Sequence, residues 1–297
     1  MINLKIKYMK IIIYCFFIIT SFQLNAQFGG TQKKEILTSR FLKTNLHILL
    51  TGDEHFDKNL KKGFEDFWTI TEFEFIKNLD EIDTEDESVS YLCPTQKTIT
   101  DNYSTQTYNR YGILIGGKEN FNFRNVADII LDNFGYEKFV IEAAYRAYDM
   151  PKLMQDYIQM RIDGAPISGK TPIKIRYSAG FVYNKKSPKI KQKTLLVDKR
   201  QLKSGKYFPY GRKKEFSQAD FTSLYNGKVK FVSTKELEEA INERNSNFTY
   251  LSTVFSRKKY ILVIDCESGS LWYNGYEPSG IGITKKDVKK LSKTVNN

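Results

Sequence analysis

Apolar positions near the start of the chain predict a strand, a helix and a second strand. Residues 46–50 form a short apolar run that reaches a glycine, which indicates a buried strand. Four aromatic and aliphatic residues then recur at the spacing of one helix face: Phe56, Leu60, Phe64 and Phe67. Asp53 precedes this face and is a favoured residue type for a helix N-cap. Residues 72–76 alternate polar and apolar positions and predict the second strand.

The middle of the chain predicts two further strands and two helices. Residues 88–93 and 111–117 are the strands, and we expect Pro94 to end the first, with polar, turn-rich residues between them. A short helix is expected from the spacing of Val126, Ile129, Ile130 and Phe134. A longer helical stretch covers residues 136–162, and Pro151 should kink or split it because proline lacks the amide hydrogen.

The C-terminal part of the chain predicts a capped helix, a hairpin and a last helix. Ser233 and Glu236 have the spacing of a capping box. Residues 260–265 form an apolar strand, and residues 271–273 return from it after a turn. Thr284 precedes the last amphipathic helix. The elements together predict an α/β fold: a mixed sheet with flanking helices, a strand–helix–strand start, and a C-terminal hairpin followed by a helix.

The first residues have the pattern of an export signal. Three lysines (Lys5, Lys7 and Lys10) precede an apolar run over residues 11–20, and Ala26 is followed by Gln27. This pattern predicts a signal peptide over residues 1–26, cleaved near Ala26–Gln27, and a periplasmic or secreted mature chain. An uncleaved anchor is the alternative, since Leu24 is not an ideal residue before the cleavage point.

The remaining chain, residues 27–297, is expected to be a single α/β domain, with a subdivision near 164–172 left open. It contains no second apolar run long enough for a membrane span. With 41% hydrophobic and 27% charged residues, the composition excludes a disordered or collagen-like chain. Cys93 and Cys266 remain after cleavage, and an oxidising compartment would let them pair. The alternative is that both are buried thiols.

One motif matches the nucleotide-binding P-loop, but its context does not fit. The match consists of Gly164, Gly169, Lys170 and Thr171 at the required spacing. A P-loop needs a strand before it and a helix after it, whereas a helical stretch precedes this motif and an extended one follows. Exported proteins also meet little nucleotide triphosphate. We therefore interpret the motif as a loop, although nucleotide binding stays an alternative if the signal peptide is wrong.

A second candidate site lies where the first strand ends. Asp53, Glu54 and His55 occupy the carboxyl end of a strand, where open α/β sheets place ligands. The same Gly-x-Glu-x-Phe pattern occurs at residues 52–56 and 117–121, so Glu119 joins the candidates and an internal repeat is a hypothesis. These groups could serve an exported hydrolase or metal-dependent enzyme. The alternative is that the acids cap a helix, and no spacing indicates zinc or a cofactor.

Charge provides the third candidate. The chain has a formal net charge of +12, and its basic residues concentrate between residues 185 and 214. The candidate anion-binding residues are Lys185, Lys186, Lys189, Lys191, Lys193, Lys199 and Arg200. Such a stretch attracts phosphates, anionic lipid headgroups or acidic polysaccharide, whereas the export signal argues against nucleic acid. The leading hypothesis is a non-enzymatic envelope protein that binds anionic components. A solvated lysine-rich face is the alternative. The acidic run at residues 80–87 is interpreted as a solvated loop.

Overall fold

The computed structural model shows an α/β protein built from two units. It describes residues 36–100, 105–117, 125–133, 144–163, 186–202, 216–255, 259–277 and 283–296. We refer to residues 36–163 as the N-terminal unit and to residues 186–296 as the C-terminal unit. Each unit contains one mixed five-stranded sheet with helices packed on it. The predicted fold class is therefore confirmed, with two sheets where one was expected.

The N-terminal unit begins with the predicted strand, helix and strand. Its elements are β1 (Asn45–Leu49), α2 (Glu54–Phe67), β2 (Phe73–Ile76), the 3-10 helix η1 (Leu79–Glu81), β3 (Val89–Thr100), β4 (Thr105–Ile115), β5 (Asn125–Asn133) and α4 (Ala144–Ile162). The sheet order is β2-β1-β3-β4-β5. Strand β1 pairs in parallel with β2 and β3, and the β3–β4 and β4–β5 pairs are antiparallel.

The C-terminal unit repeats this topology. Its elements are the 3-10 helix η3 (Ser187–Gln192), β6 (Thr194–Asp198), α6 (Gln218–Leu224), β7 (Val229–Val232), α7 (Thr234–Asn242), β8 (Phe248–Phe255), β9 (Lys259–Asp265), β10 (Leu271–Glu277) and α8 (Lys285–Asn296). The sheet order is β10-β9-β8-β6-β7. Strand β6 pairs in parallel with β7 and β8, and the β8–β9 and β9–β10 pairs are antiparallel. The predicted C-terminal hairpin and helix are confirmed.

Strand registers also correspond between the units. In β1, Leu46 pairs with Phe73 of β2 and Ser90 of β3. In β6, Leu195 pairs in the same way with Val229 of β7 and Thr249 of β8. The adjoining residues Tyr91 and Tyr250 then pair with Leu114 and Ile264 of the next strand. The two units therefore share one β-α-β-β-β-β-α arrangement, to which the C-terminal unit adds α7 between β7 and β8.

This repeat differs from the repeat that the sequence pattern suggested. The first Gly-x-Glu-x-Phe segment joins β1 to α2, as expected. The second begins at Gly117, after β4, which is a different place in the topology, and residues 118–124 lie outside the described part of the chain. The strand registers of β1–β4 and β6–β9 show where the correspondence lies.

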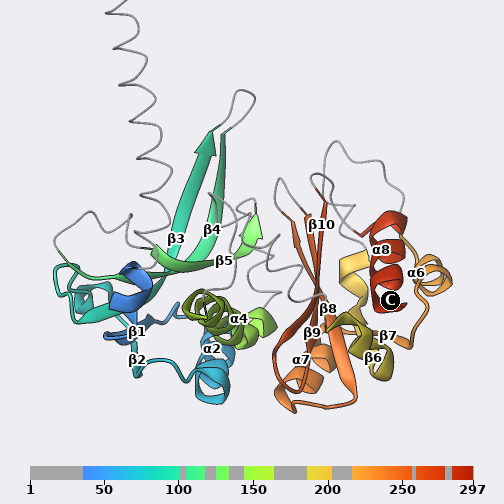
Figure 1. The fold of residues 1–297 in the computed structure, drawn as a ribbon, viewed down its shortest axis with the longest axis horizontal. Coiled ribbons are helices and arrows are strands. Elements are labelled where there is room, and N and C mark those ends of the chain that lie inside the picture. Colours follow the sequence, from blue (N-terminus) through green and yellow to red (C-terminus); the bar gives the residue numbers. More distant parts are fainter. Residues whose placement is uncertain are drawn as a thin grey trace, which may run out of the picture.

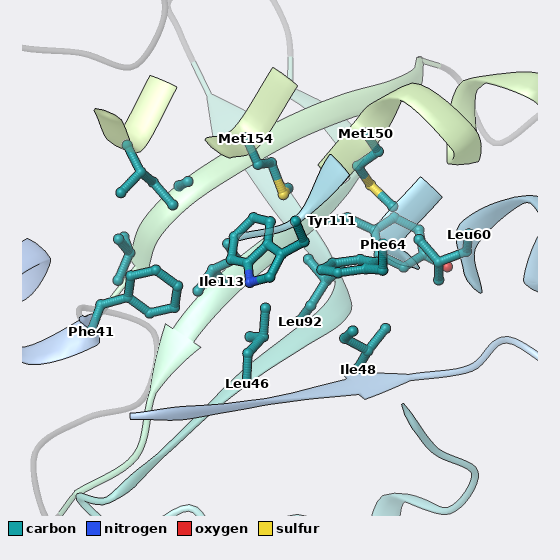
Figure 2. Packing of buried hydrophobic residues seen from close by; sticks show 14 of the residues in the cluster. Phe41, Leu46, Ile48, Leu60, Phe64, Leu92, Tyr111, Ile113, Met150 and Met154 are labelled. Atoms are coloured by element: carbon teal, nitrogen blue, oxygen red, sulfur yellow. The ribbon is translucent and has the colours of Figure 1, made fainter. Parts of the chain in front are cut away.

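The helices α2 and α4 lie between the two sheets, whereas α6 and α8 cover the far side of the second sheet (Figure 1). Buried side chains of β1, β3 and β4 pack against α2 and α4 to form the core of the N-terminal unit (Figure 2). Phe64 lies at its centre and is fully buried. Other side chains of α2 and α4, among them Phe67 and Tyr148, pack with the facing side of the second sheet and with α7.

Two local expectations were wrong because strand pairing overrides local pattern, and of the kink or split expected at Pro151 the split does not occur. The segment predicted as a helix at residues 126–134 is strand β5, which pairs with β4. Strand β3 continues through Pro94, at a point beyond the end of β1, so the missing amide hydrogen leaves the β1 ladder intact. Helix α4 continues through Pro151 without splitting, with Met150 and Met154 buried on either side of it.

The described part of the chain has no helix that is both long and apolar enough to cross a membrane. The proposed signal peptide, the P-loop match at 164–171 and the subdivision near 164–172 all lie outside the described residues.

Candidate anion-binding surface

The strand-end candidates at Asp53, Glu54 and His55 have separate structural roles. Asp53 is the N-cap of α2, and its carboxylate accepts a hydrogen bond from the Phe56 amide at 2.8 Å. Glu54 is exposed in the first turn, where an acid is favoured by the helix dipole. Glu119 lies outside the described residues. The structure therefore gives the two acids the capping and dipole roles that were the alternative to chemistry.

His55 instead pairs with a residue of the other unit. Its Nε2 lies 3.3 Å from Oε2 of Glu238 on α7, whose side chain is only 15% exposed. Burial raises the pKa of the Glu238 carboxyl, while His55 and Arg200 act in the opposite direction. Arg200 is itself ion-paired with the buried carboxylate of Asp198 at 3.0 Å. The cations and carboxylates near this contact are therefore paired with one another. The contact between α2 and α7 joins the two units.

The basic stretch divides into paired and exposed cations. Lys193 lies 2.6 Å from Asp265 and stacks over the Trp272 ring, and Arg200 is paired with Asp198. Their charges are therefore balanced locally. Lys186, Lys189, Lys191 and Lys199 are exposed, and Lys185 lies outside the described residues.

Three of these lysines, at helix η3, are directed toward solvent because the opposite side of the helix is fixed to the core of the C-terminal unit. Ile190 is fully buried, and the Ser187 hydroxyl donates a hydrogen bond to the Trp272 carbonyl at 2.8 Å. Lys186, Lys189 and Lys191 therefore point away from the core. The ammonium group of Lys191 lies 3.3 Å from the Asn296 carbonyl at the end of α8, which places η3 beside that helix.

Helix α8 adds five lysines that the sequence analysis did not single out. Its buried side carries Val288, Leu291 and Val295. The exposed lysines of α8 are Lys285, Lys286, Lys289, Lys290 and Lys293. They recur at three- and four-residue spacing, so they form a stripe along one helix face with about 5.4 Å between turns. In the sequence, this stripe could have been recognised from the doublets Lys285-Lys286 and Lys289-Lys290, which lie on either side of the predicted apolar position Val288.

Because η3 lies beside α8, we group the exposed lysines at these two helices and call them the basic face: Lys186, Lys189, Lys191, Lys285, Lys286, Lys289, Lys290 and Lys293. Lys285 also pairs with Asp220 of α6 at 3.1 Å. The acid within α8 is Asp287, which is buried and forms an ion pair with Lys259. That carboxylate therefore does not offset the exposed lysines at the surface.

The charge of the whole chain is distributed unevenly between the units. Residues 36–163 contain 14 Lys and Arg against 22 Asp and Glu, whereas residues 186–296 contain 23 against 11. The formal charges are therefore −8 and +12. Helix α8, which carries five lysines of the basic face, lies on the side of the second sheet that is turned away from the N-terminal unit (Figure 1).

The remaining candidates do not form a second site. Cys93 and Cys266 are both buried in different hydrophobic clusters, and no disulfide joins them, so the alternative of two buried thiols is the one the structure shows. Asp83 and Asp86 in the acidic run accept hydrogen bonds from nearby backbone amides and are otherwise solvated. Among the described residues, no group of three His, Cys, Asp or Glu side chains could hold a metal ion. Comparison with family models, curated proteins and solved structures finds no significant match.

Proposed function

We propose that this chain is an exported, non-catalytic binding protein that holds anionic components of the cell envelope through its basic face. The observation that carries the proposal is the gathering of exposed lysines from two segments, η3 and α8, that are distant in the sequence. Export follows from the pattern of residues 1–26, which predicts a signal peptide.

The residue types on the basic face favour electrostatic attraction over recognition of one defined ligand. All of its cations are lysines, whose compact and strongly hydrated charges act as points. Arginines, which bind phosphate and carboxylate with two parallel hydrogen bonds, are lacking among the described residues of η3 and α8. We therefore infer that the ligand is a repetitive polyanion, such as an anionic lipid surface or an acidic polysaccharide.

The basic face also indicates binding on a surface without insertion into it. The exposed large hydrophobic residues of the described chain are Ile36, Leu42 and Ile162, all in the N-terminal unit. Insertion of a helix into a bilayer requires an apolar face directed outward. Each lysine near an anionic surface contributes about 1 kcal/mol at physiological salt. If five of the eight lysines of the basic face lie near the anionic surface at one time, their sum is about 5 kcal/mol, which is enough for reversible attachment.

The charge difference between the units gives this attachment a direction. A molecule with a basic unit and an acidic unit turns its basic unit toward an anionic surface. The N-terminal unit, with a formal charge of −8, would then face away from that surface.

The test is a pull-down of the chain from Gln27 onward on isolated cell envelopes, across a salt series. The basic-face variant replaces five lysines by glutamine: Lys186, Lys189, Lys191, Lys289 and Lys293. A control variant makes the same change in charge at exposed lysines elsewhere: Lys43, Lys58, Lys77, Lys230 and Lys235.

We expect the wild type and the control variant to bind at low salt and to dissociate as salt rises, because salt screens exposed charges. The basic-face variant should be mostly in the supernatant at every salt concentration. Equal binding by the two variants would contradict the proposed surface, and binding that ignores salt would contradict its electrostatic nature. Vesicles of anionic lipid and an immobilised acidic polysaccharide, used in parallel, would distinguish the two sources of negative charge.

A further inference from the structure

Helix α4 carries an acidic residue in the contact between the two units. Asp149 is only 2% exposed. Tyr145, one helical turn earlier, packs edge-on against the Tyr250 ring of β8, with 6.1 Å between ring centroids. Tyr145 and Tyr250 share a buried cluster with Cys266, which follows β9. This side of α4 therefore faces the second sheet.

The carboxyl group of Asp149 lacks a full set of partners. Its Oδ2 atom is buried and accepts no hydrogen bond from the part of the chain that the structure describes. The favourable charge near it is that of Arg146, three residues earlier on α4. Arg146 reaches across to the second sheet, where its Nη2 donates to the carbonyl oxygen of Thr253 on β8.

The other ionisable groups on the neighbouring elements are paired or neutral. On α2, Asp66 accepts hydrogen bonds from Lys62 and from Tyr148 of α4. At the end of β9, Asp265 pairs with Lys193. The remaining pair on α4 joins Lys152 to Asp156.

The Cys266 thiol is buried, and burial raises its pKa, so it stays neutral. Neither this thiol nor the paired groups on α2 and β9 provide Asp149 with a counter-charge.

An ionised carboxylate in this place would be costly. A buried charge without full hydrogen bonding favours its neutral form instead. Burial accordingly raises the pKa of Asp149 well above its usual range, and Arg146 opposes this only in part. Asp149 therefore holds a proton in the folded protein over a range of pH in which an unfolded aspartate has lost it.

We propose that Asp149 is a proton-dependent lock between the two sheets. While protonated, it lets α4 pack against β8, and Arg146 bridges to the Thr253 carbonyl. Once ionised, it attracts the Arg146 guanidinium to its own helix, at the i, i+3 spacing, and removes that bridge. The contact between the units then loosens as the pH rises.

The direction of the pH effect follows from the raised pKa. The contribution of Asp149 to stability is complete below its unfolded pKa of about 3.9. It is lost as the pH rises toward the folded pKa, because only the folded state still binds the proton there. Within this window the folding equilibrium constant falls by up to about tenfold per pH unit, and above the window it becomes level.

The experiment compares the chain from Gln27 onward with Asp149→Asn and with the control Asp156→Asn. Asparagine has the size of aspartate but does not titrate, and Asp156 lies on the same helix in an ion pair with Lys152. Folding constants from urea unfolding are measured between about pH 4 and pH 9, a range that begins near the unfolded pKa. Hydrogen exchange of the amides of α4 and β8 is followed in the same range.

We expect the ratio of the wild-type constant to that of Asp149→Asn to fall with pH and then level off. The protection factors of the α4 and β8 amides, in which the intrinsic pH dependence of exchange is divided out, should fall over the same interval in the wild type and in Asp156→Asn, but not in Asp149→Asn. A ratio that is flat or rises with pH would overturn the proposal. A falling ratio without a loss of protection in α4 and β8 would also overturn it, because the carboxyl would then titrate without opening the contact.

Discussion

The buried ion pair between Lys259 and Asp287 holds the helix of the basic face in place, and Asp287→Asn tests its contribution. Both side chains are 2% exposed, so water screens neither charge. Lys259 lies on β9 and Asp287 in the first turn of α8. Asparagine keeps the size of the side chain but leaves the ammonium group of Lys259 without this counter-charge. Removing one partner of a buried pair costs about 3–5 kcal/mol, or about two to four orders of magnitude in the folding constant.

Loss of the helix cap is a smaller and separable effect. Asp287 also accepts hydrogen bonds from the amide and the hydroxyl of Thr284, each at 2.7 Å. Asparagine retains an oxygen that can accept from this amide. The control Thr284→Ala removes the hydroxyl alone and should cost about 1 kcal/mol, as is typical of an N-cap.

The assay is urea unfolding followed by the helical circular dichroism signal. We expect Asp287→Asn to lower the unfolding free energy several times more than Thr284→Ala does. Adding Lys259→Met should restore most of the loss, because the buried charge is then gone and the side chain remains long. A loss no larger than that of Thr284→Ala would refute the reasoning, since it would mean that the charge of Asp287 contributes little beside the buried ammonium group of Lys259.

Three further results are expected. Phe64→Ala, at the centre of the core between α2 and the first sheet, should lower the unfolding free energy by about 3–5 kcal/mol in the same assay. Gly116→Ala would place a methyl group on the backbone carbonyl of Asp86, and we expect a loss of about 1–3 kcal/mol, with native stability contradicting this close approach. Cys93 and Cys266 should stay unreactive toward a thiol reagent in the native protein and react after denaturation, and rapid native labelling would contradict their burial.

Local patterns in the sequence were sufficient for elements whose partners are nearby in the chain. Phe56, Leu60, Phe64 and Phe67 are all buried on α2 as their spacing predicts, the first three in the core of the first sheet and Phe67 in the cluster shared with the second sheet. A helix forms its backbone hydrogen bonds within itself, so its apolar spacing can be recognised without knowing which elements it packs against. The capping box of Ser233 and Glu236 is formed as expected, since its groups are three residues apart.

The tertiary structure decided the elements whose partners are distant. Val126 and its apolar neighbours have helical spacing, but this segment is a strand because it pairs antiparallel with the edge of β4. The duplication of the fold is visible in strand registers and not in a shared motif. Register depends on pairing between strands that are separated by tens of residues.

The same division holds for the candidate site. The sequence by itself showed that basic residues concentrate between residues 185 and 214. Only the structure paired Lys193 and Arg200 with buried carboxylates and placed α8 beside η3. Charge is a property of each residue, whereas its exposure and its neighbours are set by packing. For this reason the sequence determined that the protein is basic, and the tertiary structure determined where its exposed lysines lie.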